Sequence, residues 1–244
     1  HAKFLLDASR FSCTEQALTV AAMLSVESPL FVPRAARSAA NKAHSRFNSF
    51  EADHLTLLNV YTAFAEAQSN REWCKNNFVK AGTLVKASRV REQLVEMLNK
   101  ARAQPAAAAT QADKGGKGVK LAKQPAGAEP AHPKSAEGAQ ISGNFDAEPL
   151  LQCLVSSFSL RIAQKLPKDS TPGVRYKTVM EGLEVRIHPS SCLSRRDPMP
   201  DWVVFNELVL TSKKYLKGVA AVQQQWLTEF APNMFKTKEQ AALT

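Results

Sequence analysis

The first 100 residues space their apolar side chains as an α-helix does. Leu55, Leu58, Tyr61 and Phe64 recur every third residue, which places them in one stripe along a helix. Similar patterns predict helices in four more places: after Ser12, over residues 34–47, around Trp73 to Val79, and from about Thr83. We therefore expect residues 1–100 to form a bundle of helices.

Two of these helices begin with residues that favour helix capping. Ser12 stands three residues before Glu15, the spacing of a capping box in which each side chain bonds the other's backbone amide. Asp53 is placed to accept the first free amides of its own helix. Because His54 follows it, a catalytic His–Asp pair is the alternative, but no nucleophile accompanies the pair in the sequence.

In the last 100 residues, the spacing of the apolar side chains changes from that of a helix to that of a strand. Leu183, Val185 and Ile187 alternate with polar residues, as in a strand with one buried face. The pattern predicts a helix over residues 148–166 and strands within residues 174–180, 182–191, 201–222 and 226–232. Several short strands separated by turn residues predict a small β-barrel in residues 145–244.

The segment between these two zones, residues 101–144, contains no aromatic residue and is rich in Ala, Pro, Gly and Lys. It has too little apolar surface to offset the entropy cost of ordering, so we predict a disordered linker. The chain is therefore predicted to be an α+β multidomain protein. Its parts would be a helical domain at 1–100, a linker at 101–144, and a small β-barrel with flanking helices at 145–244.

The chain is strongly basic, with a formal net charge of +10 and a pI of about 9.6. This charge favours an anionic partner, such as a nucleic acid or an acidic surface. Charge alone does not separate that interpretation from a generic basic protein.

The four cysteines are scattered, and no two of them form a Cys-x-x-Cys pair. Reduced thiols in a nuclear or cytoplasmic protein fit this usage best. His188 and Cys192 have the spacing of two zinc ligands on a helix, but Pro189 favours a turn and no second pair exists. We therefore predict no metal site.

The sequence also contains no apolar run of membrane-spanning length, and its first residues do not resemble a secretion signal. We expect neither a membrane partner nor secretion. The first residue is His1 rather than methionine, so we expect a piece of a longer protein.

Several phrases of the sequence, in the same order, resemble the DEAH-box RNA helicases. CTEQALTVAAMLSVESPLFVP, DHLTLLNVY, WCKNNF and LVKASRVREQL are similar to the family's helicase-associated, or ratchet, region. YKTV, IHPSS, WVVFNELVLTSKKYLKGV and WLTEFAP are similar to the OB-fold domain that follows it. Asn206 departs from the family pattern, which usually has a histidine there. The resemblance implies a ratchet-like bundle and an OB-fold barrel that close over single-stranded RNA.

The sequence lacks the motifs of an ATP-hydrolysing motor. It has no Gly-x-x-x-x-Gly-Lys-Ser/Thr phosphate loop, no Asp-Glu-Ala-His motif and no arginine-finger motif. In DKGGKGVK no Ser or Thr follows the lysines, and no strand precedes the segment. We expect this chain to bind no cofactor by itself. The resemblance implies that ATP and Mg²⁺ bind to motor domains upstream in the same protein.

Comparison with the family implies RNA contacts on the last helix of the bundle and on the first strand of the barrel. On the helix, Lys86, Arg89 and Arg91 would line the RNA channel, and the alternative is a solvated face paired with Glu92 or Glu96. On the strand, Arg175 and Lys177 would face phosphates, while Tyr176 points into the core.

Two further segments of the barrel are candidates for RNA contact. His188, Ser190 and Ser191 lie at a proline turn, where they would contact a phosphate oxygen or else cap the turn itself. The segment that follows the strand WVVFNELVL, which we call the strand exit, is the one best suited to contact RNA. The alternative for this segment is a plain surface hairpin. The residues of the strand exit are Thr211, Ser212, Lys213 and Lys214.

The leading hypothesis is the RNA-gripping accessory region of a DEAH-box RNA helicase. Its partners would be single-stranded RNA and the motor domains of the same protein. The alternative is a protein-interaction or adaptor module that docks a helicase activator, on the barrel, or a ribonucleoprotein partner.

Overall fold

The computed structural model describes residues 2–103, 145–168, 170, 172–211, 213–232 and 234–235. Residues 104–144 of the predicted linker lie outside this set, so the linker stays a prediction. The described residues up to Val95 and from Asp146 onward belong to one compact unit. No helix within the described ranges combines the length and apolarity needed to cross a bilayer.

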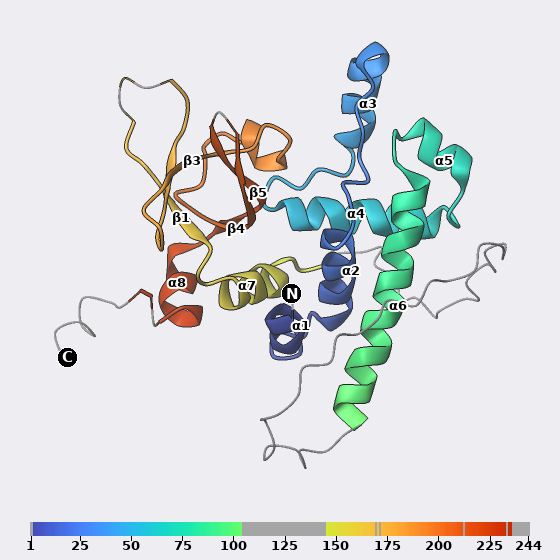
Figure 1. Cartoon of the computed structure of the whole chain (residues 1–244), viewed down its shortest axis with the longest axis horizontal. Helices are drawn as coiled ribbons and strands as arrows, with labels where there is room; N and C mark the ends of the chain where they lie inside the picture. The colour runs from blue at the N-terminus through green and yellow to red at the C-terminus, as the bar shows by residue number, and fades with distance from the viewer. Residues whose placement is uncertain are drawn as a thin grey trace, which may run out of the picture. The chain divides into compact units, whose positions relative to one another are not determined.

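The first part of the chain is helical, as predicted (Figure 1). Its elements are α1 (Ala2–Asp7), α2 (Thr14–Leu24), η1 (Arg34–Ala36), α3 (Arg37–His44), α4 (Asp53–Glu66), α5 (Arg71–Asn76) and α6 (Ala81–Ala103). The predicted stripe on α4 is largely buried: Leu58 and Phe64 are 2% exposed, and the half-buried Tyr61 donates a hydrogen bond to Ser88 Oγ. Phe64 packs in a cluster with Met23 and Leu84, so the apolar periodicity identified this core.

The predicted capping box at Ser12 is wrong. Cys13 occupies the N-cap position of α2, and no side chain caps that helix. Ser12 has a φ of 54°, in the left-handed region, because a tight turn follows α1. The Cys13 amide closes this turn by donating to the Ala8 carbonyl at 3.0 Å. An N-cap needs extended backbone, which this turn does not allow at Ser12.

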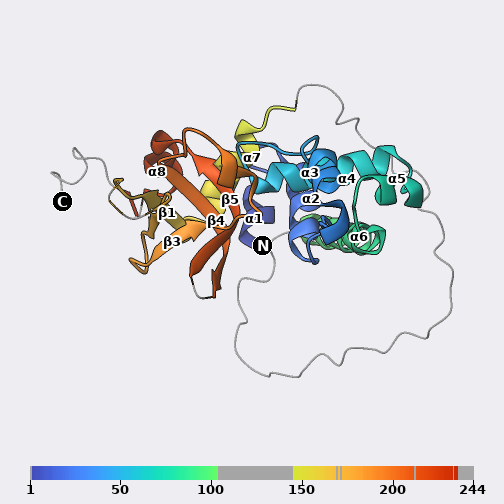
Figure 2. The ribbon, with the colours of Figure 1, turned by 90° about the horizontal axis from the view of Figure 1, so that it is seen from above.

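The second part of the chain forms a closed barrel in the strand order β1-β2-β3-β5-β4 (Figures 1 and 2). Its elements are α7 (Glu148–Ser157), β1 (Ile162–Lys165), β2 (Tyr176–Thr178), β3 (Glu184–Ile187), η2 (Cys192–Arg195), β4 (Trp202–Leu210), β5 (Lys214–Val222) and α8 (Gln224–Phe230). β3 pairs with β5 in parallel, and the other pairs are antiparallel. Tyr176 is fully buried inside the barrel, as predicted, and its hydroxyl donates to the Pro200 carbonyl at 2.8 Å.

Two elements of this part differ from the prediction. The helix predicted over 148–166 ends at Ser157, and Ile162–Lys165 is strand β1. β1 pairs with both β2 and β4, so the barrel closes only if these residues leave the helix. The strand predicted within 226–232 is instead part of helix α8, in which Trp226 and Leu227 are buried.

Candidate nucleic-acid interface

Residues 50–53, which we call the joint, bind the start of α4 to the barrel. The Phe50 carbonyl accepts a hydrogen bond from the Arg196 guanidinium at 3.0 Å. The Glu51 carbonyl accepts one from the Ala221 amide at 2.8 Å, and Ala52 forms an antiparallel bridge with Ala220. The joint therefore lies beside β5 of the barrel, which it meets through one isolated bridge and a backbone hydrogen bond.

Asp53 completes the joint with three hydrogen bonds from the barrel. Its carboxylate accepts from Ser191 Oγ at 2.9 Å, from the Cys192 amide at 2.8 Å and from the Val219 amide at 2.9 Å. The prediction that Asp53 caps its own helix is therefore wrong, since Ala52 is the N-cap and Asp53 is the first helical residue. The positive end of the α4 dipole still favours a carboxylate at this position.

The structure gives no support to a catalytic His54–Asp53 pair. His54 is 1% exposed, and neither ring nitrogen has a hydrogen-bond partner among the described residues. Burial lowers the pKa of His54 to about 4, against the opposing charge of Asp53. Burial, together with Asp53, raises the pKa of the nearby Cys192 thiol, so that thiol stays protonated. Cys192 is therefore not an activated nucleophile for this pair.

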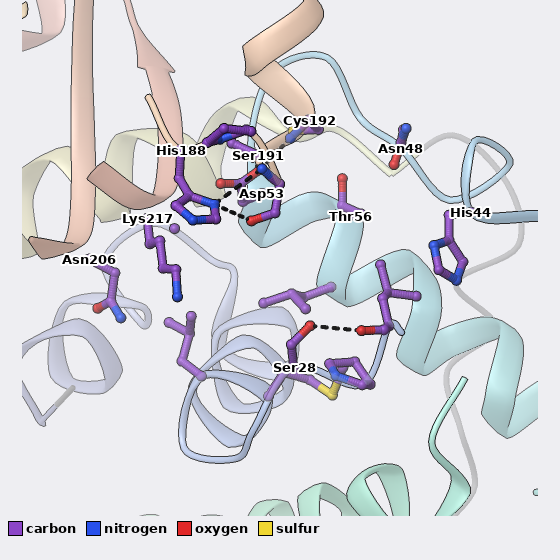
Figure 3. A pocket seen from close by; sticks show the side chains of 18 of the residues that line it. Ser28, His44, Asn48, Asp53, Thr56, His188, Ser191, Cys192, Asn206 and Lys217 are labelled. Carbon is purple, nitrogen blue, oxygen red and sulfur yellow. Dashed lines mark hydrogen bonds between the residues drawn. The ribbon is translucent and has the colours of Figure 1, made fainter. Parts of the chain in front are cut away.

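A cavity of about 460 Å³, which we call the cleft, lies beside the joint (Figure 3). The segments around α2, α3 and α4 provide an apolar wall that includes Met23, Leu30 and Leu57. The barrel provides a more polar wall that includes His188, Asn206, Lys217 and the turn at Pro189–Cys192. The volume and the mixture of apolar and polar walls are typical of a ligand site.

His188 is held in one orientation at the polar wall of the cleft. Its Nδ1 accepts a hydrogen bond from the Ser190 amide at 3.1 Å, and its ring meets the Tyr215 ring edge-on at 5.4 Å. Burial and the charge of Lys217 lower the pKa of His188. At neutral pH the proton of this imidazole therefore resides on Nε2, which is left to donate to a ligand.

A second hollow of about 760 Å³, which we call the basic groove, adjoins the cleft, because Pro189 and Arg195 line both. Its charged lining residues are Arg37, Arg186, Arg195, Arg196, Lys213 and Asp197, so five cations face one carboxylate. Arg186 is fixed by donating to the Pro172 carbonyl at 2.8 Å, and Arg196 by its bond to the joint. Arg195 and Lys213 are exposed, so they are available to an anion.

The structure places part of the predicted RNA-contact set at these two hollows. His188, Ser190 and Ser191 line the cleft, and Lys213 lines the basic groove. The Ser191 hydroxyl donates to Asp53, which ties the turn at Pro189 to the joint. Within the turn, the Ser190 amide donates to His188 Nδ1 at 3.1 Å, so the turn also partly caps itself.

The remaining members of the strand exit lie outside both hollows. Thr211 donates to the Lys213 carbonyl at 2.8 Å and lines neither hollow. Lys214 is exposed on β5 and also lines neither. Ser212 is outside the described residues.

The other predicted residues do not line either hollow. Arg91 donates to Thr19 and is ion-paired with Glu15 on α2, not with the predicted Glu92 or Glu96. Lys86 and Arg89 are exposed on α6.

Arg175, which was predicted on the first barrel strand, lies directly before β2, the second strand. It is ion-paired with Glu184 at 3.0 Å, and its side chain is 12% exposed. Lys177 is exposed. As RNA contacts, these five residues on α6 and at β2 stay predictions.

Sequence analysis missed most of the residues that line the basic groove. Arg37 and Arg195 are 158 positions apart, and no local pattern indicates that they face one hollow. The adjacent pair Arg195 and Arg196 was the available signal. Asn206, already noted as a departure from the family pattern, lines the cleft.

Comparison with known proteins agrees with this architecture. Residues 1–57 match the family described as Helicase associated domain (HA2), ratchet-like, and residues 150–234 match the oligonucleotide/oligosaccharide-binding (OB)-fold family. The first match covers the joint, and the second covers the barrel with α8. The chain belongs to the helicase-associated and OB-fold region of the DEAH-box RNA helicases.

Individual relatives match almost the whole of this helicase region. The chain is 34% identical over 240 residues to a probable ATP-dependent RNA helicase DHX35 of Pongo abelii, covering 98% of this chain and 28% of that protein. It is 32% identical to ATP-dependent RNA helicase DHX33 of Mus musculus, covering 99% of this chain and 28% of the relative.

A third relative is the pre-mRNA-splicing factor ATP-dependent RNA helicase prp22 of Schizosaccharomyces pombe. The identity is 30%, over 96% of this chain and 16% of that protein. The chain therefore spans less than a third of the length of each of these relatives.

Proposed function

We propose that this region grips single-stranded RNA while motor domains of the same protein hydrolyse ATP. The observation that supports the proposal most is the basic groove, in which five cations face one carboxylate beside the exposed turn at Pro189. Cations of this kind bind phosphates, and the adjoining cleft has the mixed walls that suit a base or sugar. Pro189 lines both hollows, so one strand of RNA has a continuous surface.

RNA binding by this chain tests the proposal directly. A fluorescently labelled single-stranded RNA of about 12 nucleotides is titrated with the chain at several salt concentrations and followed by anisotropy. We expect a Kd of roughly 1–100 µM that weakens steeply as salt rises, because phosphate contacts release counterions. Arg195→Ala and Lys213→Ala should each weaken binding and reduce the salt slope by about 1.

Arg71→Ala is the matched control, since Arg71 is exposed and lines neither hollow. It should leave the affinity close to wild type. Binding that does not respond to salt, or equal losses from Arg71→Ala and Arg195→Ala, would exclude phosphate-led binding in the basic groove.

ATP coupling and the wider partners belong to the same proposal. The relatives are named as ATP-dependent RNA helicases, which suggests that ATP and Mg²⁺ act in motor domains outside this chain. An antibody against residues 1–100 tests this on whole-cell extract. A band several tens of kilodaltons above 26.7 kDa supports the proposal, and a band at 26.7 kDa contradicts it.

A protein-docking role is the second candidate, because the barrel exposes apolar side chains beside β1. Leu160 is 59% exposed and Met180 is 51% exposed, and the Val179 amide bonds the Ile162 carbonyl at 2.9 Å. Charge reversal at Lys213 and Lys214 separates the two roles. Loss of RNA binding with an activator protein still bound favours RNA gripping, and the converse favours docking.

A further inference from the structure

Two cysteine thiols from distant parts of the sequence lie in one gap between α1 and α7. Cys153 Sγ is 3.6 Å from the Phe4 carbonyl of α1. Cys13 Sγ is 3.9 Å from the Pro149 carbonyl of α7. Because Pro149 and Cys153 are one helical turn apart, both sulfur atoms lie against the same turn of α7.

The two thiols also shift each other's pKa. The neighbouring Cys153 thiol lowers the pKa of the Cys13 thiol, although burial opposes this effect. Cys13 in turn raises the pKa of Cys153, and burial adds to that shift. Cys13 is therefore the better nucleophile of the two, and Cys153 is the proton donor beside it.

We propose that Cys13 and Cys153 form a reversible disulfide when the protein meets a peroxide. The other two cysteines provide the contrast. Cys74 lies in the core of the helical bundle, and Cys192 lies beside Asp53 in the joint. Neither shows a second thiol within its hydrogen bonds among the described residues, so neither has a partner for this reaction.

The chemistry needs one equivalent of hydrogen peroxide. The Cys13 sulfur attacks one peroxide oxygen, the O–O bond breaks, and a sulfenic acid and one water result. The Cys153 sulfur then attacks the sulfenic sulfur, the S–O bond breaks, and the disulfide forms with release of a second water. Two thiols lose two electrons and two protons in total, and one peroxide is reduced to two waters.

Peroxide has a route to these buried thiols through α1. This helix has six residues, and such a short helix opens locally at lower cost than the core. Cys13 lies at the end of the turn that follows it, so opening of α1 exposes the nucleophile first.

The disulfide would tie the start of α2 to α7, which packs against α8 and β5. It would close a loop of residues 13–153 that includes helices α2 to α6. A loop of this length lowers the entropy of the unfolded chain substantially. We therefore expect oxidation to raise the unfolding midpoint by about 5 °C or more.

Peptide mapping of the whole chain tests the proposal without any variant. Trypsin places the four cysteines in separate peptides, at residues 11–34, 72–75, 135–161 and 187–195. The folded chain is treated with hydrogen peroxide, alkylated in denaturant, digested without reductant and analysed by mass spectrometry. We expect the 11–34 and 135–161 peptides to be joined, and the link to disappear with dithiothreitol.

Thermal unfolding provides the second measurement. Cys153→Ser should abolish both the link and the oxidation-dependent rise in midpoint, whereas Cys74→Ser should retain both. Complete alkylation of Cys13 and Cys153 after peroxide treatment would overturn the proposal. Links to the 72–75 or 187–195 peptide in equal yield would also overturn it.

Discussion

Asp53 joins the helices to the barrel through its own side chain. One carboxylate satisfies a hydroxyl and two backbone amides from separate barrel segments. Hydrogen bonds to a charged group contribute about 1.5–3 kcal/mol each, and a donor left unsatisfied in a buried site costs a similar amount.

Asp53→Asn should therefore destabilise the chain by about 2–4 kcal/mol in urea unfolding, because an amide presents N–H groups to the barrel's own donors. Glu66→Gln is the matched control, since it removes one negative charge from the exposed far end of the same helix. It should change the free energy of unfolding by less than about 0.5 kcal/mol. Equal effects of the two variants would show that the joint contributes little stability.

His54 should make the stability of the chain depend on pH. Its folded pKa of about 4 lies below the ordinary value of 6.5, so between these values the unfolded chain binds more protons. The free energy of unfolding is therefore not reduced by His54 above pH 6.5. It falls as the pH drops toward 4, by up to about 3 kcal/mol from this residue.

Urea unfolding at pH 7.5 and pH 5 measures this effect. His54→Leu should lose less stability than the wild type when the pH is lowered, because leucine has no proton to bind. An unchanged pH dependence in this variant would mean that His54 is not the group responsible.

At the level of the elements, local periodicity identified the long helices. It did not identify strand β1 or helix α8, the elements that open and follow the barrel. The segment before β1 continues an apolar pattern from α7, and nothing local indicates that Ile162 must leave the helix. Closure of the sheet decides this, since β1 is the strand that joins β2 to β4. In α8, Trp226 and Phe230 are four residues apart, a helical spacing that the strand prediction overlooked.

Gly218 in β5 should resist substitution more than the other glycines of the barrel. It has a φ of 60°, and an added Cβ would approach Asn206 Cβ to 2.8 Å. Gly182 has a similar φ of 65°, but its Cβ would meet only Lys177 Cε at 3.6 Å. A side chain at either position would be strained by the positive φ. Only at Gly218 would the added Cβ also clash with a neighbouring side chain.

Gly182→Ala should cost about 1 kcal/mol of unfolding free energy, and Gly218→Ala should cost at least about 1 kcal/mol more. Gly82→Ala on α6 is the control for glycine removal, because an added Cβ there meets nothing within 4 Å. It should stabilise the chain by about 0.5–1 kcal/mol. Chemical unfolding of the three variants gives the comparison, and equal costs at Gly182 and Gly218 would rule out the clash.

At the scale of the whole molecule, the described residues up to Val95 form one compact unit with the barrel, and the joint is one of the contacts within it. The predicted division into separate domains at 1–100 and 145–244 stays a prediction, although each part has its own core. The interface residues come from both parts: Arg37 belongs to α3, whereas Arg195 and Lys213 belong to the barrel. An RNA strand bound in the groove would contact both parts at once.

The sequence by itself determined the order of the helical and barrel zones, the buried stripe of α4 and the inward position of Tyr176. These features are local, because a period of 3.6 or 2 residues records which face of an element is buried. The family resemblance likewise depended on short phrases in order.

Only the tertiary structure decided which side chains meet. It brought Asp53 to Ser191, Arg37 and Arg195 to one groove, and the thiols of Cys13 and Cys153 to one turn of α7. These residues are more than 100 positions apart, and no periodic signal links such distant positions. Their contacts follow from how the bundle and the barrel pack together, which the pattern of one chain does not encode locally.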